Sequence, residues 1–207
     1  MQIVIKASAQ QHSAFLSKPL PADSRVYWYG KDVLPEKADA WFDLCYEEEG
    51  AAFTETNSIV FANAVLATTT VLPKNYVRIN AWTGFLERTV TEVAATAHSA
   101  EVKHVMHQLG WSYTLVPDVP GMVSARIIAM IINEAYFALG DEVSSKNDID
   151  TAMKLGTNYP LGPFEWCEKI GIRKIYQLLN SLSEQDERYT PAPELCHEAA
   201  AQFNSKA

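Results

Sequence analysis

Residues 118–166 read DVPGMVSARIIAMIINEAYFALGDEVSSKNDIDTAMKLGTNYPLGPFEW, and this stretch decides the fold of the second half of the chain. Pro120-Gly121 is a turn signal that precedes a long apolar run. From Val123 to Leu139 the apolar residues recur at helical spacing and surround almost the whole helix. This pattern predicts a helix buried in a core or against a partner chain. We expect Gly140 to end that helix.

Further helices are predicted after this one. Ser145 is placed as an N-cap, and Asp148 follows at the spacing of a capping box, so a second helix should begin there and stop at Gly156. The turn at 159–165 contains two prolines and should open a third helix, since proline is favoured at a helix start. Two more helices are expected, at residues 172–182 and 193–203.

The first part of the chain has a different pattern, in which short β-branched or aromatic runs alternate with helical or irregular connections. Such alternation is typical of an open, mostly parallel sheet. We therefore predict an α/β domain at 1–117 followed by an all-α domain at 118–207. The expected strands are 2–6, 25–29, 40–46, 58–66, 76–82 and 111–116, and the expected helices are 10–18 and 99–109.

The segments Pro120–Arg126, Asn133–Ala135, Asp148–Gly156 and Tyr159–Glu165 occur in an order that resembles the C-terminal domain of L-3-hydroxyacyl-CoA dehydrogenases. The resemblance implies that the sheet is a reduced, Rossmann-like NAD-binding domain. It also implies that the helical domain carries the dimer contact and the substrate groove. We expect a homodimer through the helix at 122–139 and an acyl-CoA ligand.

The nucleotide-binding part departs from this family. A Rossmann domain needs glycines after its first strand, because they let the pyrophosphate approach the backbone. Here Ala7-Ser8-Ala9-Gln10-Gln11 follows that strand, and no glycine occurs before Gly30. We therefore expect no cofactor, with NAD bound only if the chain is a working dehydrogenase.

The catalytic positions also differ. In the family a His lies in a segment of the form Gly-hydrophobic-His-Phe-Phe-Asn-Pro, and a Glu follows twelve residues later. Here Asn80 occupies the His position within 77–83, and Glu92 occupies the Glu position. Asparagine has no titratable proton near neutral pH, so it cannot serve as general base. Asn80 with Glu92 can also be a hydrogen-bonded pair that fixes a strand end.

The remaining site residues follow from the same resemblance. Ala125 occupies the position of a family Asn, while the neighbouring Arg126 matches the family. Asn63 is the nearest equivalent of a polar substrate contact. Tyr159, Pro163 and Phe164 are expected to border the substrate groove, and proline and phenylalanine there also suit simple helix packing.

The composition argues against several classes of protein. The net charge of -8 argues against nucleic-acid binding, which needs a basic surface. The 3 cysteines are widely spaced, and no metal-ligand pattern occurs, so we expect neither a disulfide framework nor a metal site. No run is long enough for a membrane span, and a cytoplasmic protein is the expectation.

Three interpretations remain open. The first is a 3-hydroxyacyl-CoA dehydrogenase relative of fatty-acid metabolism, homodimeric and acyl-CoA-binding, with NAD-dependent activity lost or strongly reduced. The second is an active NAD-dependent L-3-hydroxyacyl-CoA dehydrogenase with an atypical site. The third is a non-catalytic assembly or binding partner of another acyl-CoA enzyme. The sequence alone leaves open whether the chain is an enzyme.

Overall fold

The computed structural model describes residues 1–204, and it divides into two compact units, Met1–Met122 and Val123–Ala207. The predicted boundary between 117 and 118 lies slightly earlier. Asp118 and Gly121 belong to the first unit because Asp118 pairs with Arg78 there and Gly121 donates its N–H to the carbonyl of Val65. Residues 205–207 of the predicted helical domain lie outside the described part.

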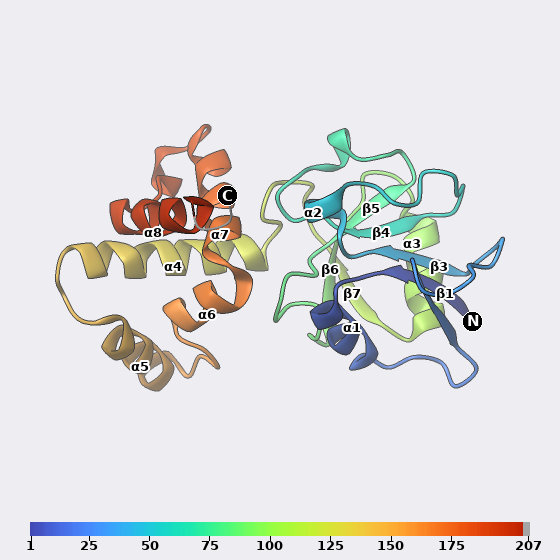
Figure 1. Ribbon diagram of the computed structural model, residues 1–207, viewed down its shortest axis with the longest axis horizontal. Coiled ribbons are helices and arrows are strands. Elements are labelled where there is room, and N and C mark those ends of the chain that lie inside the picture. The colour runs from blue at the N-terminus through green and yellow to red at the C-terminus, as the bar shows by residue number, and fades with distance from the viewer. Residues whose placement is uncertain (205–207) are drawn as a thin grey trace. The chain divides into compact units, whose positions relative to one another are not determined.

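The first unit is built on one seven-stranded sheet in the order β2-β1-β3-β4-β5-β6-β7 (Figure 1). The β1–β2, β1–β3, β3–β4 and β4–β5 pairs are parallel, β5 and β6 are antiparallel, and β6 and β7 are parallel. This is the expected α/β unit with a mostly parallel sheet. The strands are β1 (Gln2–Lys6), β2 (Arg25–Trp28), β3 (Ala40–Asp43), β4 (Val60–Asn63), β5 (Tyr76–Ile79), β6 (Val90–Ala94) and β7 (Ser112–Leu115).

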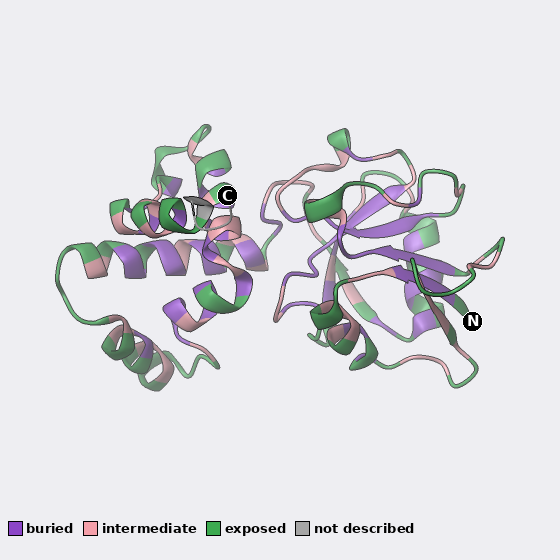
Figure 2. Cartoon of the chain, in the orientation of Figure 1, coloured by how far each residue is buried: buried purple, intermediate pink, exposed green. Residues whose placement is uncertain are grey.

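Helices pack on one face of this sheet. Strand residues alternate between faces, so Ile3, Ile5 and Phe42 join a core with Phe15 of α1 (Ala9–Leu16) and Met106 of α3 (Ser99–Leu109). The opposite face, which carries Val4, Trp41, Val60 and Tyr76, is packed by loop residues such as Phe53 and Leu34. The central strands are accordingly buried on both sides (Figure 2).

The sequence located most of these elements and erred at four places, one of them the predicted strand at 76–82, which ends at Ile79. β6 was not predicted, because Val90–Ala94 combines exposed and polar positions with only a short apolar end. The predicted strand at 40–46 ends at Asp43 and is followed by the short helix α2 (Tyr46–Glu49). The predicted strand at 58–66 is ordered as a strand only over Val60–Asn63. A single turn η1 (Thr69–Val71) follows.

The described residues of the second unit form five α-helices and one short 3₁₀ helix. They are α4 (Ser124–Gly140), α5 (Lys146–Thr157), α6 (Pro163–Ile170), α7 (Ile172–Ser183), η2 (Glu187–Tyr189) and α8 (Pro193–Asn204). All five α-helices were predicted. The predicted stops differ by one residue: α4 includes Gly140, and α5 continues to Thr157 before Asn158 turns to a positive φ.

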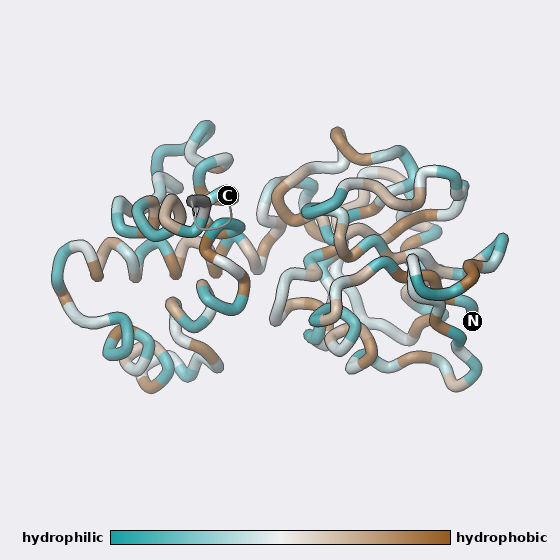
Figure 3. Tube along the Cα trace, viewed as in Figure 1, coloured by the Kyte–Doolittle hydropathy of each residue, from teal (hydrophilic) through white to brown (hydrophobic). Residues whose placement is uncertain are grey.

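Helix α4 is the central element of the second unit. Its buried residues include Ile128, Ile132 and Tyr136. Hydrophobic residues recur along this helix as brown segments in Figure 3. The hydroxyl of Tyr136 donates to Glu198 of α8 at 2.5 Å, and burial raises the pKa of this tyrosine. The helix is not buried all round, however, because Ile127 is 55% exposed.

No helix among the described residues is long and apolar enough to cross a membrane.

Candidate functional site

Two asparagines meet at the carboxyl ends of neighbouring parallel strands. Asn63 is the last residue of β4, and Asn80 directly follows β5. Asn63 accepts a hydrogen bond from the N–H of Ala81 at 3.1 Å and donates to the carbonyl of Leu44 at 3.4 Å. Its amide therefore bonds to backbone groups on both sides and holds the strand ends together.

The antiparallel strand β6 brings Glu92 beside Asn80. The N–H of Asn80 donates to the carbonyl of Glu92 at 3.3 Å, and its side-chain amide donates to Oε2 of Glu92 at 3.5 Å. The amide oxygen of Asn80 accepts from the N–H of Trp82 at 3.4 Å. Asn80 is 3% exposed, so these contacts fix its orientation. The pair can bind a carbonyl or hydroxyl group, but its amide cannot take a proton.

Glu47 is a neighbour that the sequence did not single out. Its Oε1 accepts from the N–H groups of Val65 at 2.5 Å and Leu66 at 2.7 Å, and its Oε2 accepts from the indole N–H of Trp82 at 2.7 Å. Glu47 thus connects α2 with the loop after β4 and with the segment after β5. Three consecutive glutamates in the sequence look like a solvated surface, so no local signal identified this one.

Arg78 was also missed, although a cation inside an apolar strand is an available signal. Its position corresponds to the glycine of the family pattern, and its side chain is fully buried. The guanidinium pairs with Asp118 at 2.6 Å. It also donates to the carbonyls of Ala64 at 2.7 Å, Val65 at 3.1 Å and Val119 at 3.2 Å. Arg78 therefore holds the backbone of the loop after β4 and links it to the segment at Val119.

Asp118 is held by more than this ion pair. It accepts from the N–H of Thr69 at 3.1 Å and from its hydroxyl at 2.5 Å. Partial burial opposes the charged carboxylate, but the hydrogen bonds from Thr69 and Arg78 outweigh burial and lower the pKa of Asp118. Asp118 is thus charged near neutral pH and fixes the loop after β4.

The turn between β1 and α1 is where a Rossmann fold receives a pyrophosphate. Here the first turn of α1 is capped by its own residues: Gln11 N–H donates to Ser8 Oγ at 3.4 Å, and Ser8 N–H donates to Gln11 Oε1 at 2.9 Å. Gln11 Nε2 also donates to the carbonyl of Leu44 at 2.7 Å. The side chain of Gln11 therefore occupies the place where a pyrophosphate would approach this turn, so a dinucleotide bound here would have to displace it.

Five predicted site residues belong to the second unit. Ala125 is buried in α4, and Arg126 lies with its guanidinium 5.5 Å from the centre of the Tyr189 ring. Tyr159 is exposed in the turn after α5. Pro163 begins α6, and the Phe164 ring packs edge-on against Tyr136 at 5.0 Å. Their expected ligand contacts stay predictions.

The Asp-Ile-Asp and Gly-Pro-Phe-Glu segments meet through a contact that the sequence analysis did not assign. Asp150 of α5 accepts from the N–H groups of Phe164 at 2.8 Å and Glu165 at 3.1 Å, at the start of α6. A Cβ on Gly162 would lie 2.3 Å from Oδ1 of Asp150. Glycine is therefore required at position 162 for α6 to approach this carboxylate.

Comparison with known proteins identifies relatives of this chain. Residues 121–205 match the model of the 3-hydroxyacyl-CoA dehydrogenase C-terminal domain. A 3-hydroxyadipyl-CoA dehydrogenase of Escherichia coli (strain K12) is 43% identical over 107 residues, which are 50% of this chain and 22% of that protein. A 3-hydroxybutyryl-CoA dehydrogenase of Clostridioides difficile is 31% identical over 158 residues, which are 73% of this chain and 55% of that protein.

The helical unit belongs to the 3-hydroxyacyl-CoA dehydrogenase family. The crystal structure of a 3-hydroxybutyryl-CoA dehydrogenase from Escherichia coli K12 aligns with a TM-score of 0.61 and 30% identity, over 75% of this chain and 35% of that one. An (S)-3-hydroxybutyryl-CoA dehydrogenase from Ralstonia eutropha aligns with a TM-score of 0.69 and 18% identity, over 98% of this chain and 94% of that one. At 18% identity, the similarity to the Ralstonia eutropha structure shows a shared fold.

The match of residues 121–205 to this family, together with the relatives named above, corrects the expectation that no cofactor is bound. The homologues are NAD-dependent dehydrogenases, so NAD is the cofactor that the family implies. The absence of the glycine loop was the wrong ground for excluding it. The chain spans between 22% and 55% of the length of the two curated relatives named above.

Proposed function

We propose that this 3-hydroxyacyl-CoA dehydrogenase relative binds an acyl-CoA thioester and carries out NAD-dependent oxidation of a 3-hydroxyacyl group only at a strongly reduced rate. The observation that carries the proposal is the pair of Asn80 and Glu92. The sequence resemblance puts these two residues at the positions of the family His and Glu, and the group that contacts Glu92 here is an amide.

The chemical consequence concerns the hydroxyl proton. When NAD is bound, its nicotinamide supplies the hydride acceptor, and a neighbouring base must take the proton from the substrate hydroxyl. Asn80 can donate a hydrogen bond to the substrate oxygen but cannot accept that proton. Loss of a general base costs about 10²–10⁴-fold in rate. Binding of a 3-oxoacyl group can persist, because a carbonyl oxygen needs only a donor.

The acyl-CoA ligand is supported by the relatives. The two curated proteins above are named for 3-hydroxyadipyl-CoA and 3-hydroxybutyryl-CoA. The similarity covers the helical unit, where Tyr159 is exposed and Arg126 is half-exposed. An exposed aromatic ring and a guanidinium are suitable contacts for a pantetheine arm and a phosphate, respectively.

The proposal includes a homodimer through α4. Ile127 of α4 and Val123, which directly precedes that helix, are exposed, and Leu155 of α5 is 83% exposed. Large exposed side chains of this kind mark interaction surfaces when they gather on one part of a protein. A second copy of the chain is the partner that would cover them.

Thermal unfolding with acetoacetyl-CoA tests the binding part of the proposal. A ligand that binds only the folded state must raise the unfolding midpoint. We expect acetoacetyl-CoA to raise it more than CoA alone, while consumption of NADH with the same substrate stays slow. An unchanged midpoint at saturating ligand contradicts acyl-CoA binding, and rapid NADH consumption contradicts the reduced rate.

A further inference from the structure

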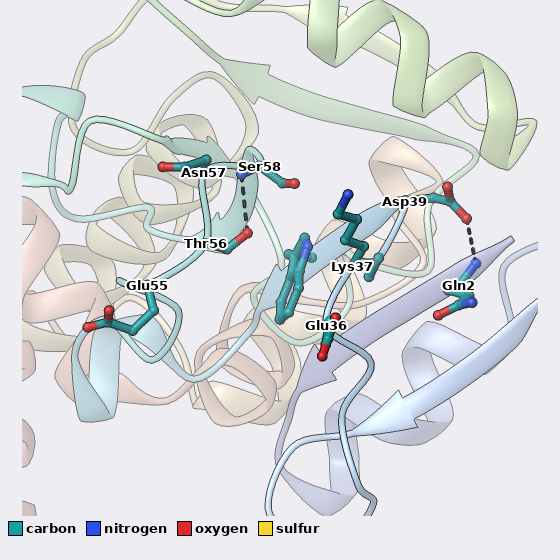
Figure 4. A pocket seen from close by; sticks show the side chains of 10 residues that line it. Gln2, Glu36, Lys37, Asp39, Glu55, Thr56, Asn57 and Ser58 are labelled. Carbon is teal, nitrogen blue, oxygen red and sulfur yellow. Dashed lines mark hydrogen bonds between the residues drawn. The ribbon is translucent and has the colours of Figure 1, made fainter.

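A cavity of about 720 Å³ lies at the amino ends of three strands in the first unit (Figure 4). Gln2 begins β1, Asp39 precedes β3 and Ser58 precedes β4, and all three line the cavity. Asn63 and Asn80 lie at the opposite ends of the strands. The cavity is therefore separate from the candidate site, and an inference about it does not depend on the proposed function.

Hydrogen bonds fix the backbone on two sides of this cavity. Gln2 N–H donates to Oδ2 of Asp39 at 2.6 Å, and Ser58 N–H donates to Oγ1 of Thr56 at 3.1 Å; both are drawn as dashed lines in Figure 4. The side-chain amide of Asn75 further holds the carbonyls of Thr56 and Ser58 at 3.0 and 3.1 Å. The loops around the cavity are thus anchored to the sheet.

Trp41 lines this cavity and carries an unused hydrogen-bond donor. The residue is 8% exposed, and its buried indole N–H has no hydrogen-bond partner among the described residues. By contrast, the indole N–H groups of Trp82 and Trp111 donate to Glu47 and to the carbonyl of Pro19. A buried donor without an acceptor costs free energy. A ligand that offers an oxygen acceptor to Trp41 would remove this cost.

The charges of the lining exclude several ligand classes. Glu36, Asp39 and Glu55 contribute three carboxylates, against the single ammonium group of Lys37. This excess of negative charge disfavours phosphates and carboxylates. An ammonium ion would suit the carboxylates, but it has no lone pair to accept from Trp41. A hydroxyl group can accept from Trp41 and donate to a carboxylate at the same time.

We propose that this cavity binds a neutral polyhydroxylated molecule of the sugar or cyclitol class. One hydroxyl accepts from the indole N–H of Trp41, and a second donates to the carboxylate of Glu55. Neither Glu55 nor Lys37 has a hydrogen bond or ion pair from its side chain within residues 1–204, so both are free to meet a ligand. Asn57, beside Glu55, can both donate and accept.

Proton–nitrogen correlation spectra of the full chain test this proposal, because each of the 5 tryptophans gives one indole signal. The Trp41→Phe variant identifies the Trp41 signal by its loss. We expect glucose or myo-inositol to shift this signal saturably in the millimolar range. The absence of a shift with both compounds overturns the proposal.

A surface variant separates the ligand class from a change in folding. Glu55→Gln lies on an exposed loop and should weaken glucose binding about 5-fold, because it replaces a charged hydrogen-bond acceptor by a neutral one. Glu134→Gln on α4 is the matched control and should leave binding unchanged. Equal binding by the Glu55→Gln variant, or tighter binding of phosphorylated glucose or putrescine than of glucose, rules out the neutral polyol.

Discussion

The side-chain amide of Asn80 lies 3.5 Å from a carboxylate oxygen of Glu92, across the antiparallel pair of β5 and β6. A backbone hydrogen bond of 3.3 Å between the same two residues keeps them in register. Under the proposed function, Glu92 is the carboxylate that would orient a base, and Asn80 stands in the position of that base. A substitution that puts a base at position 80 therefore tests the proposed chemistry of the site directly.

Replacing Asn80 by His should restore proton transfer. Glu92 would favour the charged imidazolium and orient the ring. We expect Asn80→His combined with Ala125→Asn to raise NADH-dependent reduction of acetoacetyl-CoA by about 10²-fold or more. The loss of NADH absorbance measures it. Adding Glu92→Gln should remove most of the gain, and no gain at all in the first variant would show that a missing base does not limit the rate.

The buried pair of Arg78 and Asp118 should contribute strongly to stability near neutral pH. Asp118→Asn leaves the guanidinium buried without its counter-charge, at a cost of about 3 kcal/mol. Chemical unfolding measures the loss. Glu49→Gln, which breaks the more exposed pair with Lys6, is the control and should cost less than about 1 kcal/mol.

The pH dependence of this pair has a defined sign. The folded pKa of Asp118 lies below its ordinary value of 3.8, so the pair stabilises the fold above that value. Its contribution is lost as the pH falls through the lower, folded pKa. The stability difference between the wild-type chain and Asp118→Asn should therefore shrink as the pH is taken below 3.8. A difference that is constant with pH would contradict this account.

Gln11 should oppose nucleotide binding, because its side chain holds Ser8 and the carbonyl of Leu44. Gln11→Ala frees the N–H of Ser8 and removes the side chain that lies where a pyrophosphate would approach the start of α1. We expect the variant to bind NADH more tightly than the wild-type chain, as measured by calorimetry. His12→Ala, one residue further along α1, is the control; equal affinities for Gln11→Ala and the wild-type chain would show that Gln11 does not obstruct the site.

The dimer proposal predicts that a charge on α4 prevents self-association. Ile127 is exposed, so Ile127→Glu should leave the fold of one chain intact and disfavour burial against a second copy. Light scattering should report a dimer for the wild-type chain and a monomer for the variant. Leu16→Glu, an equally exposed apolar position on α1, is the control. A wild-type monomer at micromolar concentration refutes the dimer.

The sequence predicted the helices whose ends carry a clear local signal, such as a glycine. It missed the residues and the strand whose roles depend on contacts with parts of the chain far away in the sequence. The helix at 99–109 was predicted with the bounds that the structure has, because Gly110 adopts the positive φ of a helix end. The family resemblance singled out Asn80 and Glu92, and their hydrogen bond was one of the two interpretations that it left open. Glu47, Arg78 and Asp150 were missed, because each acts on backbone groups far away in the sequence. Strand β6 was missed because its polar residues face other parts of the fold.

The close approach of Gly162 to Asp150 couples two positions in evolution. A methyl group at position 162 would collide with the Asp150 carboxylate. That carboxylate cannot move away without losing its hydrogen bonds to two backbone N–H groups. A selection that starts from Gly162→Ala should therefore recover second changes at 150 to smaller side chains. The helical half of this family would then vary at these two sites together, or not at all.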